Sequence, residues 1–209
     1  MAISKPSSLC IALIGGIASG KSTVSQLFET EGIVTLDADQ VARDLVAPQG
    51  ACYQGVLDHF GADFFNPDHT LNRSHLRAYI FEHPKERDWL EKLLHPKIRE
   101  ALELQASTHH NTVCLVAIPL LKRREDYAFC QRVLYIKTTQ ELQLTRLMQR
   151  DRIDETRALQ ILKAQPSDQD YRRLADDVIE NSGNLEALKI QVQRLAARYL
   201  ASMGHLGNS

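Results

Sequence analysis

Eight consecutive residues near the start of the chain have the types and the spacing that bind a nucleoside triphosphate. The segment Gly15–Ser22 reads Gly-Gly-Ile-Ala-Ser-Gly-Lys-Ser and fits the pattern Gly-x-x-x-x-Gly-Lys-Ser/Thr without a gap. Its glycines let the backbone curl so that successive N–H groups point at a phosphate. Lys21 can reach the β- and γ-phosphates, and the Ser22 hydroxyl can ligate Mg²⁺. This phosphate-binding loop, or P-loop, predicts triphosphate binding with Mg²⁺ and transfer of a phosphoryl group.

The residues around the P-loop favour this interpretation over an ordinary glycine-rich turn. An apolar run, Leu9–Ile14, precedes the loop, and an amphipathic pattern over Lys21–Glu31 follows it. The motif requires a strand before the loop and a helix after it, because the helix N-terminus adds its dipole to the anion site. GTPases, transport ATPases and small-molecule kinases all share this loop, so the loop alone does not identify the reaction.

Two carboxylates, Asp37 and Asp39, follow the next apolar run, Ile33–Leu36. Ligands of open α/β sheets bind at the carboxyl ends of the strands, where both the P-loop and this pair are expected to lie. A carboxylate there can accept the proton of an attacking hydroxyl, or hold Mg²⁺ through water. The alternative is structural, because an aspartate at this point can cap a helix that begins near Gln40.

The third apolar run, Val113–Ile118, ends in Pro119-Leu120-Leu121 and lacks the terminal aspartate of a Walker B strand. This argues against a motor ATPase. It also leaves the coordination shell of Mg²⁺ to Ser22, to water and to the two aspartates of the preceding strand.

The elements that must position these residues are short apolar runs that alternate with longer amphipathic stretches. The apolar runs are nearly continuous, as in a parallel sheet that helices cover on both faces. We expect strands at Leu9–Ile14, Ile33–Leu36, Val113–Ile118, Val133–Ile136 and Asp177–Glu180. We expect helices at Lys21–Glu31, Lys85–Gln105, Thr139–Arg150 and Leu185–Leu200. This order predicts a three-layer α/β domain, with a parallel sheet flanked by helices.

We interpret residues 1–209 as a single domain with two helical additions. Residues 48–106 contain no clear strand and several chain breakers, among them Gly61 and Pro67, and predict a helical insertion after the second strand. Residues 146–173 are helical and strongly charged, with seven basic side chains. Such a run is usually a solvated pair of surface helices, and the alternative is a mobile lid.

Composition argues against several other classes of protein. A net charge of −1, from 25 basic and 26 acidic residues, gives no reason to expect nucleic acid or an anionic membrane as a partner. No run approaches the roughly 18 apolar residues of a membrane span, and the N-terminus lacks the pattern of a secretory signal. The four cysteines contain no Cys-x-x-Cys pair, so we expect reduced thiols and a cytoplasmic protein.

Further motifs resemble those of the dephospho-coenzyme A kinase family, and the similarity runs from about Cys10 to Leu200. The matching pieces occur in the order typical of that family: Gly-Gly-Ile-Ala-Ser-Gly-Lys-Ser-Thr at 15–23, Asp-Ala-Asp at 37–39, Phe60-Gly61, Leu71-Asn72-Arg73, Leu94-His95-Pro96, Pro119-Leu120-Leu121, Gln143-Leu144-x-Arg146, Gln149-Arg150-Asp151, Ala164-Gln165 and Ala175-Asp176-Asp177-Val178-Ile179-x-Asn181. The set is far more specific than the P-loop alone. It implies a P-loop fold like that of nucleoside-monophosphate kinases, with 48–106 as a helical acceptor-binding insertion and 146–173 as a helical lid.

The resemblance also implies a reaction, in which ATP phosphorylates the ribose 3′-hydroxyl of dephospho-CoA to give CoA, the final step of CoA biosynthesis. The cofactors would be ATP and Mg²⁺, and the substrates would be small molecules. We expect neither a nucleic-acid nor a membrane partner, and a monomer or weak homo-oligomer.

The matching positions take their expected roles from this family. The expected catalytic residues are Asp39 as general base, Lys21 and Arg150. The expected metal ligand is Ser22. The residues expected to contact the acceptor are Asp39, Arg73, His95 and Pro96. The residues expected to contact the nucleotide are Gly16, Ile17, Ala18, Ser19, Gly20, Lys21, Ser22, Thr23, Arg146 and Asn181.

Two departures from the family pattern bear on this site. Ala18 stands where glycine is common, which is tolerable unless the residue needs a positive φ. Arg123 stands where the family usually has glutamate, and it reverses a charge near the expected acceptor pocket. Taken without the resemblance, Arg73 would be an ordinary surface residue, and His95 before Pro96 would mark a helix interruption.

Three other functions stay open at this point. They are a kinase for another small hydroxyl acceptor such as a nucleoside, a nucleotide-dependent switch with little turnover, and a degenerate member of the family. The paired aspartates and the basic stretch count against the switch, and Arg123 is the only motive for the degenerate member. The residues alone do not decide between ATP and GTP.

Overall fold

The structure is a computed structural model that describes residues 8–206, with side chains to residue 203. Within this range five strands form one parallel sheet in the order β2-β3-β1-β4-β5. They are β1 (Leu9–Ile14), β2 (Val34–Asp37), β3 (Val113–Ala117), β4 (Arg132–Lys137) and β5 (Asp177–Glu180). All five predicted strands and the α/β fold class are confirmed, with strand ends shifted by at most one residue.

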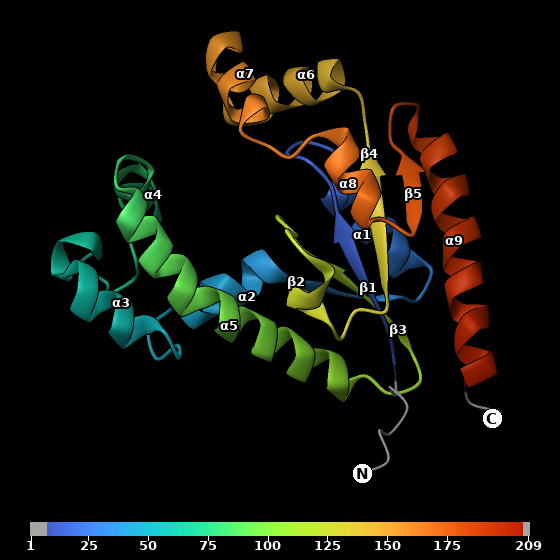
Figure 1. Cartoon of the computed structure of the whole chain (residues 1–209), viewed down its shortest axis with the longest axis horizontal. Coiled ribbons are helices and arrows are strands. Elements are labelled where there is room, and N and C mark those ends of the chain that lie inside the picture. The colour runs from blue at the N-terminus through green and yellow to red at the C-terminus, as the bar shows by residue number, and fades with distance from the viewer. Residues whose placement is uncertain (1–7, 207–209) are drawn as a thin grey trace. The chain divides into compact units, whose positions relative to one another are not determined.

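Helices cover both faces of this sheet. On one face, α1 (Lys21–Thr30) and α9 (Leu185–Leu206) pack side by side, and on the other α8 (Asp168–Leu174) lies over β4 (Figure 1). Every residue of β1 is buried because the strand is central in the sheet and covered on both sides. This burial explains why the apolar run before the P-loop is uninterrupted.

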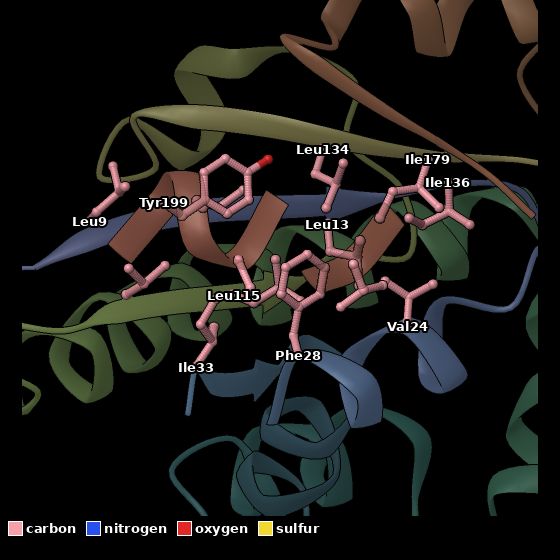
Figure 2. Packing of buried hydrophobic residues seen from close by; sticks show 14 of the residues in the cluster. Leu9, Leu13, Val24, Phe28, Ile33, Leu115, Leu134, Ile136, Ile179 and Tyr199 are labelled. Atoms are coloured by element: carbon pink, nitrogen blue, oxygen red, sulfur yellow. The ribbon is translucent and has the colours of Figure 1, made fainter. Parts of the chain in front are cut away.

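The main core lies between the sheet and the α1–α9 layer. Leu13 of β1, Leu115 of β3 and Leu134 of β4 point into it, and the rings of Phe28 and Tyr199 stack at 6.3 Å between their centroids (Figure 2). Because α1 contributes to this core directly after the P-loop, core packing fixes the position at which the loop must end.

The chain forms two compact units, residues 1–37 with 105–209 and residues 38–104. The second unit is helical and packs around its own core of Val46, Cys52, Val56, Leu76 and Leu90. Its elements are α2 (Ala38–Leu45), α3 (Tyr53–Phe60), a 3₁₀ turn at Ala62–Phe64, α4 (Arg73–Glu82) and most of α5 (Pro84–Thr108). Most of the predicted helical insertion, residues 48–106, falls within this unit.

The basic stretch forms a helical hairpin followed by a helix on the sheet. The hairpin is α6 (Gln140–Asp151) and α7 (Glu155–Lys163), joined where Arg152 takes a left-handed φ of 53°. It encloses a small core around Leu147 and Leu162. The third helix, α8, instead stacks Tyr171 on Tyr135 of β4, with 5.1 Å between ring centroids. Within the basic stretch, α6 and α7 therefore share a core separate from that of the sheet, whereas α8 packs on the sheet.

None of the helices within residues 8–206 has the length and apolarity needed to cross a membrane. The four cysteines form no disulfide, and Cys10, Cys52 and Cys114 are buried.

Candidate active site

The P-loop joins β1 to α1, and two of its glycines are required by the backbone. A side chain at Gly15 would begin 2.8 Å from the carbonyl oxygen of Ile136 on the neighbouring strand. Gly20 has a φ of 93°, a conformation that residues with a side chain rarely adopt. Gly15 lets the loop pass close to the backbone of β4, and Gly20 lets the chain turn into the first turn of α1.

Ala18 also takes a left-handed conformation, with a φ of 56°. The family's common glycine would adopt this φ freely, whereas an alanine carries a cost of about 1–2 kcal/mol. The condition under which Ala18 was expected to be strained is therefore met. Ile17 and Ala18 pack against the small core of the α6–α7 hairpin.

Lys21 lies against the P-loop backbone. Its ammonium donates hydrogen bonds to the carbonyl oxygens of Gly15, at 2.6 Å, and Gly16, at 3.1 Å. Ser22 and Thr23 are exposed in the first turn of α1. The ammonium on its flexible stem and the two hydroxyls are thus all at the mouth of the loop.

Arg146 and Asn181 are brought directly against the P-loop. Asn181 is 7% exposed, and its side chain donates from Nδ2 to the carbonyl oxygen of Ser19, at 2.8 Å. Arg146 donates from Nη2 to the Asn181 carbonyl oxygen, at 3.3 Å. Its Nη1 is buried and has no hydrogen-bond partner among the described residues. A buried guanidinium nitrogen beside Gly20 is a suitable donor to a phosphate oxygen.

Arg150 is exposed on α6 and is held by its neighbour. Its Nε and Nη2 donate to the two carboxylate oxygens of Asp151, at 2.7 and 2.9 Å. These hydrogen bonds raise the pKa of the Arg150 guanidinium. Contact with a nucleotide would therefore require Arg150 to exchange the carboxylate for a phosphate.

The two aspartates occupy different kinds of position. Asp37 ends β2, and β3 lies between β2 and β1, the strand that leads to the P-loop. Two strand spacings, together about 10 Å, therefore separate β2 from β1. The helix begins at Ala38 rather than near Gln40, so Asp39 lies in its first turn and does not cap it. Both carboxylates are exposed, and β3 ends at Ala117 without an acidic residue, as predicted.

Arg73 and the His95-Pro96 pair belong to the helical unit. Arg73 begins α4 and donates to the carbonyl oxygen of Arg43, at 3.3 Å, at the end of the helix that carries Asp39. Burial and the charge of Arg43 lower the pKa of Arg73. His95 and Pro96 line a pocket of about 330 Å³ together with charged side chains of α5. The alternative of a helix interruption at His95 is wrong, because α5 runs through Pro96 without a break.

Arg123 is 71% exposed and pairs with Asp126, at 2.9 Å. A short 3₁₀ helix, Arg124–Tyr127, presents this carboxylate three residues further along the chain. The reversed charge is therefore balanced by a neighbour that the sequence interpretation missed.

Two glutamines that carried no predicted role contact the P-loop. Gln143 Nε2 donates to the carbonyl oxygen of Ile17, at 2.9 Å, and Gln165 Oε1 accepts from the Ile17 N–H, at 3.3 Å. The sequence carried a signal for the place of one of them, because Gln143 lies three residues before Arg146 and therefore on the same face of α6, but not for its contact with Ile17.

The fold and the P-loop geometry define a nucleotide-binding protein of the P-loop kinase class. Solved structures share this fold: TT1252 from Thermus thermophilus has a TM-score of 0.76 at 26% identity and is matched over 91% of this chain and 97% of its own. A dephospho-CoA kinase from Campylobacter jejuni has a TM-score of 0.64 at 23% identity, over 92% and 97%, and supports the fold alone. Shikimate kinase from Acinetobacter baumannii shares the fold with a TM-score of 0.50 at 20% identity, over 94% and 96%.

Sequence comparison narrows the class to a family. The model of the family described as dephospho-CoA kinase matches residues 9–187. A dephospho-CoA kinase from Legionella pneumophila is 40% identical over 91% of this chain and 94% of its own length. One from Vibrio vulnificus is 42% identical over 92% and 96%. The chain belongs to the dephospho-CoA kinase family, a family of transferases, and the resemblance found in its motifs is confirmed.

Proposed function

We propose that this protein uses ATP to phosphorylate the ribose 3′-hydroxyl of dephospho-CoA, the step that completes CoA biosynthesis. The observation that carries the proposal is an assembled P-loop in a chain that matches the family over residues 9–187. We further propose that the protein acts in the cytoplasm on small molecules, as a monomer or weak homo-oligomer.

The chemistry requires a base, a positively charged phosphate site and the exclusion of water. A bond forms between the 3′-oxygen and the γ-phosphorus, and the bond from that phosphorus to the β–γ bridging oxygen breaks. In this proposal Asp39 accepts the hydroxyl proton, and Lys21, Arg146 and Arg150 neutralise charge on the phosphates. Closure of the α6–α7 hairpin keeps water away from the γ-phosphate.

The Ser22 hydroxyl at the start of α1 and the Asp37 carboxylate at the end of β2, two strands away from β1, fit Mg²⁺ bound together with the nucleotide. Mg²⁺ prefers hard oxygen ligands and keeps several waters, and the Ser22 hydroxyl and the Asp37 carboxylate are both exposed oxygen donors. When bound, Mg²⁺ supplies positive charge to the β- and γ-phosphate oxygens. Ser22 is the proposed protein ligand, and Asp37 can hold an outer water.

The remaining predicted contacts divide between donor and acceptor. The P-loop residues Gly16 to Thr23 are proposed to hold the triphosphate, with Asn181 on the loop after β5 near the adenine. Arg73, His95 and Pro96, all in the helical unit, are proposed to contact dephospho-CoA.

The direct test is ADP production with and without dephospho-CoA. We expect ADP release to depend on dephospho-CoA and to yield one CoA for each ADP, because the site is built for a hydroxyl acceptor. Arg123→Glu, measured in parallel, restores the family's usual charge, and the protein is expected to be active without it because Asp126 balances Arg123. Stimulation by a nucleoside instead of dephospho-CoA would assign a different acceptor. Slow hydrolysis without any acceptor effect would favour a nucleotide switch.

Arg150→Ala tests the lid. The variant is expected to lower kcat about 10- to 100-fold, because a guanidinium that meets the transferring phosphate stabilises the transition state. The KM for dephospho-CoA is expected to change by less than about threefold. Steady-state kinetics in both substrates provide the measurement.

The matched control for this prediction is Arg157→Ala. Arg157 is also basic and exposed on the hairpin, but it lies on α7 and donates to Gln160. Its removal is expected to leave kcat close to wild type. A rise in the dephospho-CoA KM alone in Arg150→Ala would move Arg150 to the acceptor site.

A further inference from the structure

Two carbonyl oxygens of the P-loop accept hydrogen bonds from side-chain amides of residues that are far away in the sequence. Gln143 on α6 donates to the carbonyl oxygen of Ile17, at 2.9 Å, and Asn181 after β5 donates to that of Ser19, at 2.8 Å. The two carbonyls alternate along the loop. Each is therefore drawn outward, toward its own amide.

The loop has glycines where these amides approach. A side chain at Gly16 would begin 2.5 Å from the Gln143 nitrogen, and one at Gly20 would fall on the Asn181 nitrogen. Both glycines therefore leave room for an amide as well as for a phosphate. A close fit at two separate points indicates a built arrangement rather than a chance contact.

Peptide geometry converts this outward pull into an inward orientation. No peptide bond in the described chain is cis, and in a trans peptide the C=O and the N–H point in opposite directions. The peptide that carries the Ile17 carbonyl also carries the Ala18 N–H, and the peptide of the Ser19 carbonyl carries the Gly20 N–H. Holding the two carbonyls outward therefore points these two N–H groups into the loop, where a phosphate nest needs them.

We infer that Gln143 and Asn181 are positioning residues, which set the Ala18 and Gly20 N–H groups for the nucleotide's β-phosphate. The inference rests on the proposed function only in that the loop binds a nucleotide. Gln143 also lies on the α6–α7 hairpin, whose core holds Ile17 and Ala18. Docking of the α6–α7 hairpin on the P-loop therefore also orients the N–H groups that bind phosphate. Movement of the hairpin away from the loop lowers the affinity for the phosphate.

The test exploits an asymmetry between the two glutamines that hold Ile17. Gln143 donates to the carbonyl, so Gln143→Glu sets a carboxylate against an oxygen. Gln165 accepts from the N–H, at 3.3 Å, so Gln165→Glu keeps its bond. Both variants have the same size and the same added charge beside the same residue. They differ only in the hydrogen bond.

We expect Gln143→Glu to weaken Mg²⁺–ADP binding about tenfold or more in the full-length protein, by calorimetric titration. Asn181→Asp is expected to do the same at the second carbonyl. Gln165→Glu is expected to show less than a third of the change seen in Gln143→Glu. AMP, which has no β-phosphate, is expected to bind the two glutamine variants within about threefold of wild type.

Equal weakening by Gln143→Glu and Gln165→Glu would overturn the inference, because charge alone would then explain the effect. Equal weakening of ADP and AMP would overturn it too, as general loosening of the site. If Gln143→Glu does not fold, Gln143→Met removes the donor without adding a charge, and wild-type ADP affinity in that variant contradicts the inference. These titrations use no acceptor, so they stay valid even if dephospho-CoA proves not to be the substrate.

Discussion

Asp39→Asn is expected to lower kcat about 10²- to 10⁴-fold while ATP binding and folding stay close to wild type. Asparagine has the size of aspartate but cannot accept a proton at neutral pH. Asp39 is exposed in the first turn of α2, and asparagine keeps its shape, so the replacement leaves the buried core untouched. The loss should therefore appear in turnover rather than in stability.

The position of Asp39 suits a general base. Asp39 lies in the first turn of α2, so a regular helix fixes the backbone that carries its carboxylate. The other end of α2 is fixed by the Arg73 side chain, which donates to the Arg43 carbonyl oxygen at 3.3 Å. A base on an anchored helix meets the acceptor hydroxyl in a reproducible geometry, which general base catalysis requires.

The matched control is Asp44→Asn on the same helix. Asp44 is also exposed and accepts from Gln40 Nε2, at 2.8 Å, within α2. Its replacement should leave kcat unchanged, whereas Asp39→Asn should remove nearly all turnover in single-turnover and steady-state assays. Near-wild-type turnover in Asp39→Asn would exclude Asp39 as the base and redirect the search to Asp37.

The elements of the fold could be predicted because their signals are local. Leu9–Ile14 is apolar throughout since β1 is covered on both faces, and the P-loop motif specifies its own strand and helix. Strand order carries no such local signal. The insertion of β3 between β1 and β2, which sets the gap of about 10 Å between the P-loop strand and the strand of Asp37, emerges only from tertiary packing.

The errors have physical causes as well. The helix expected at Lys85–Gln105 runs through Pro96 as predicted, and the alternative of an interruption at His95 fails because Ile98 and Leu102 are buried beyond the proline and keep the helix in place. The hydrogen bond from Gln143 to the Ile17 carbonyl oxygen joins residues 126 positions apart. The helical or strand periodicity of a sequence does not reveal such a pair. Side-chain contacts of this range are the part of the site that a single sequence does not disclose.

Asp177→Asn is expected to destabilise the protein by about 2–4 kcal/mol at pH 7. The Asp177 side chain on β5 is 7% exposed and is surrounded by donors. Arg132 Nε and the Tyr199 hydroxyl donate to its Oδ2, at 3.0 and 2.9 Å, and Arg198 donates to Oδ1. Asparagine has one oxygen, which can accept from Arg132 and Tyr199 at the Oδ2 position, but it then loses the negative charge and turns an N–H₂ toward Arg198.

Glu180→Gln on the same strand is the matched control. Glu180 has a side chain that is 52% exposed, and it pairs with Lys137 at 2.8 Å. An exposed ion pair contributes about 0–1 kcal/mol, so this variant should be nearly as stable as wild type. Urea unfolding of both variants measures the difference, and equal midpoints would show that the buried network around Asp177 adds no stability.

The stabilisation by Asp177 has a definite pH dependence. Burial raises the pKa of the Asp177 carboxyl, but the hydrogen bonds from Tyr199, Arg132 and Arg198 outweigh it, and the net pKa is lowered. A lowered folded-state pKa gives stability that is complete above the unfolded value of about 3.9 and is lost as the pH falls through the folded value. The gap in unfolding free energy between wild type and Asp177→Asn should therefore be constant from pH 7 to about pH 5 and narrow below about pH 4. A gap that instead widens on acidification would mean that the charge of Asp177 is not what the network stabilises.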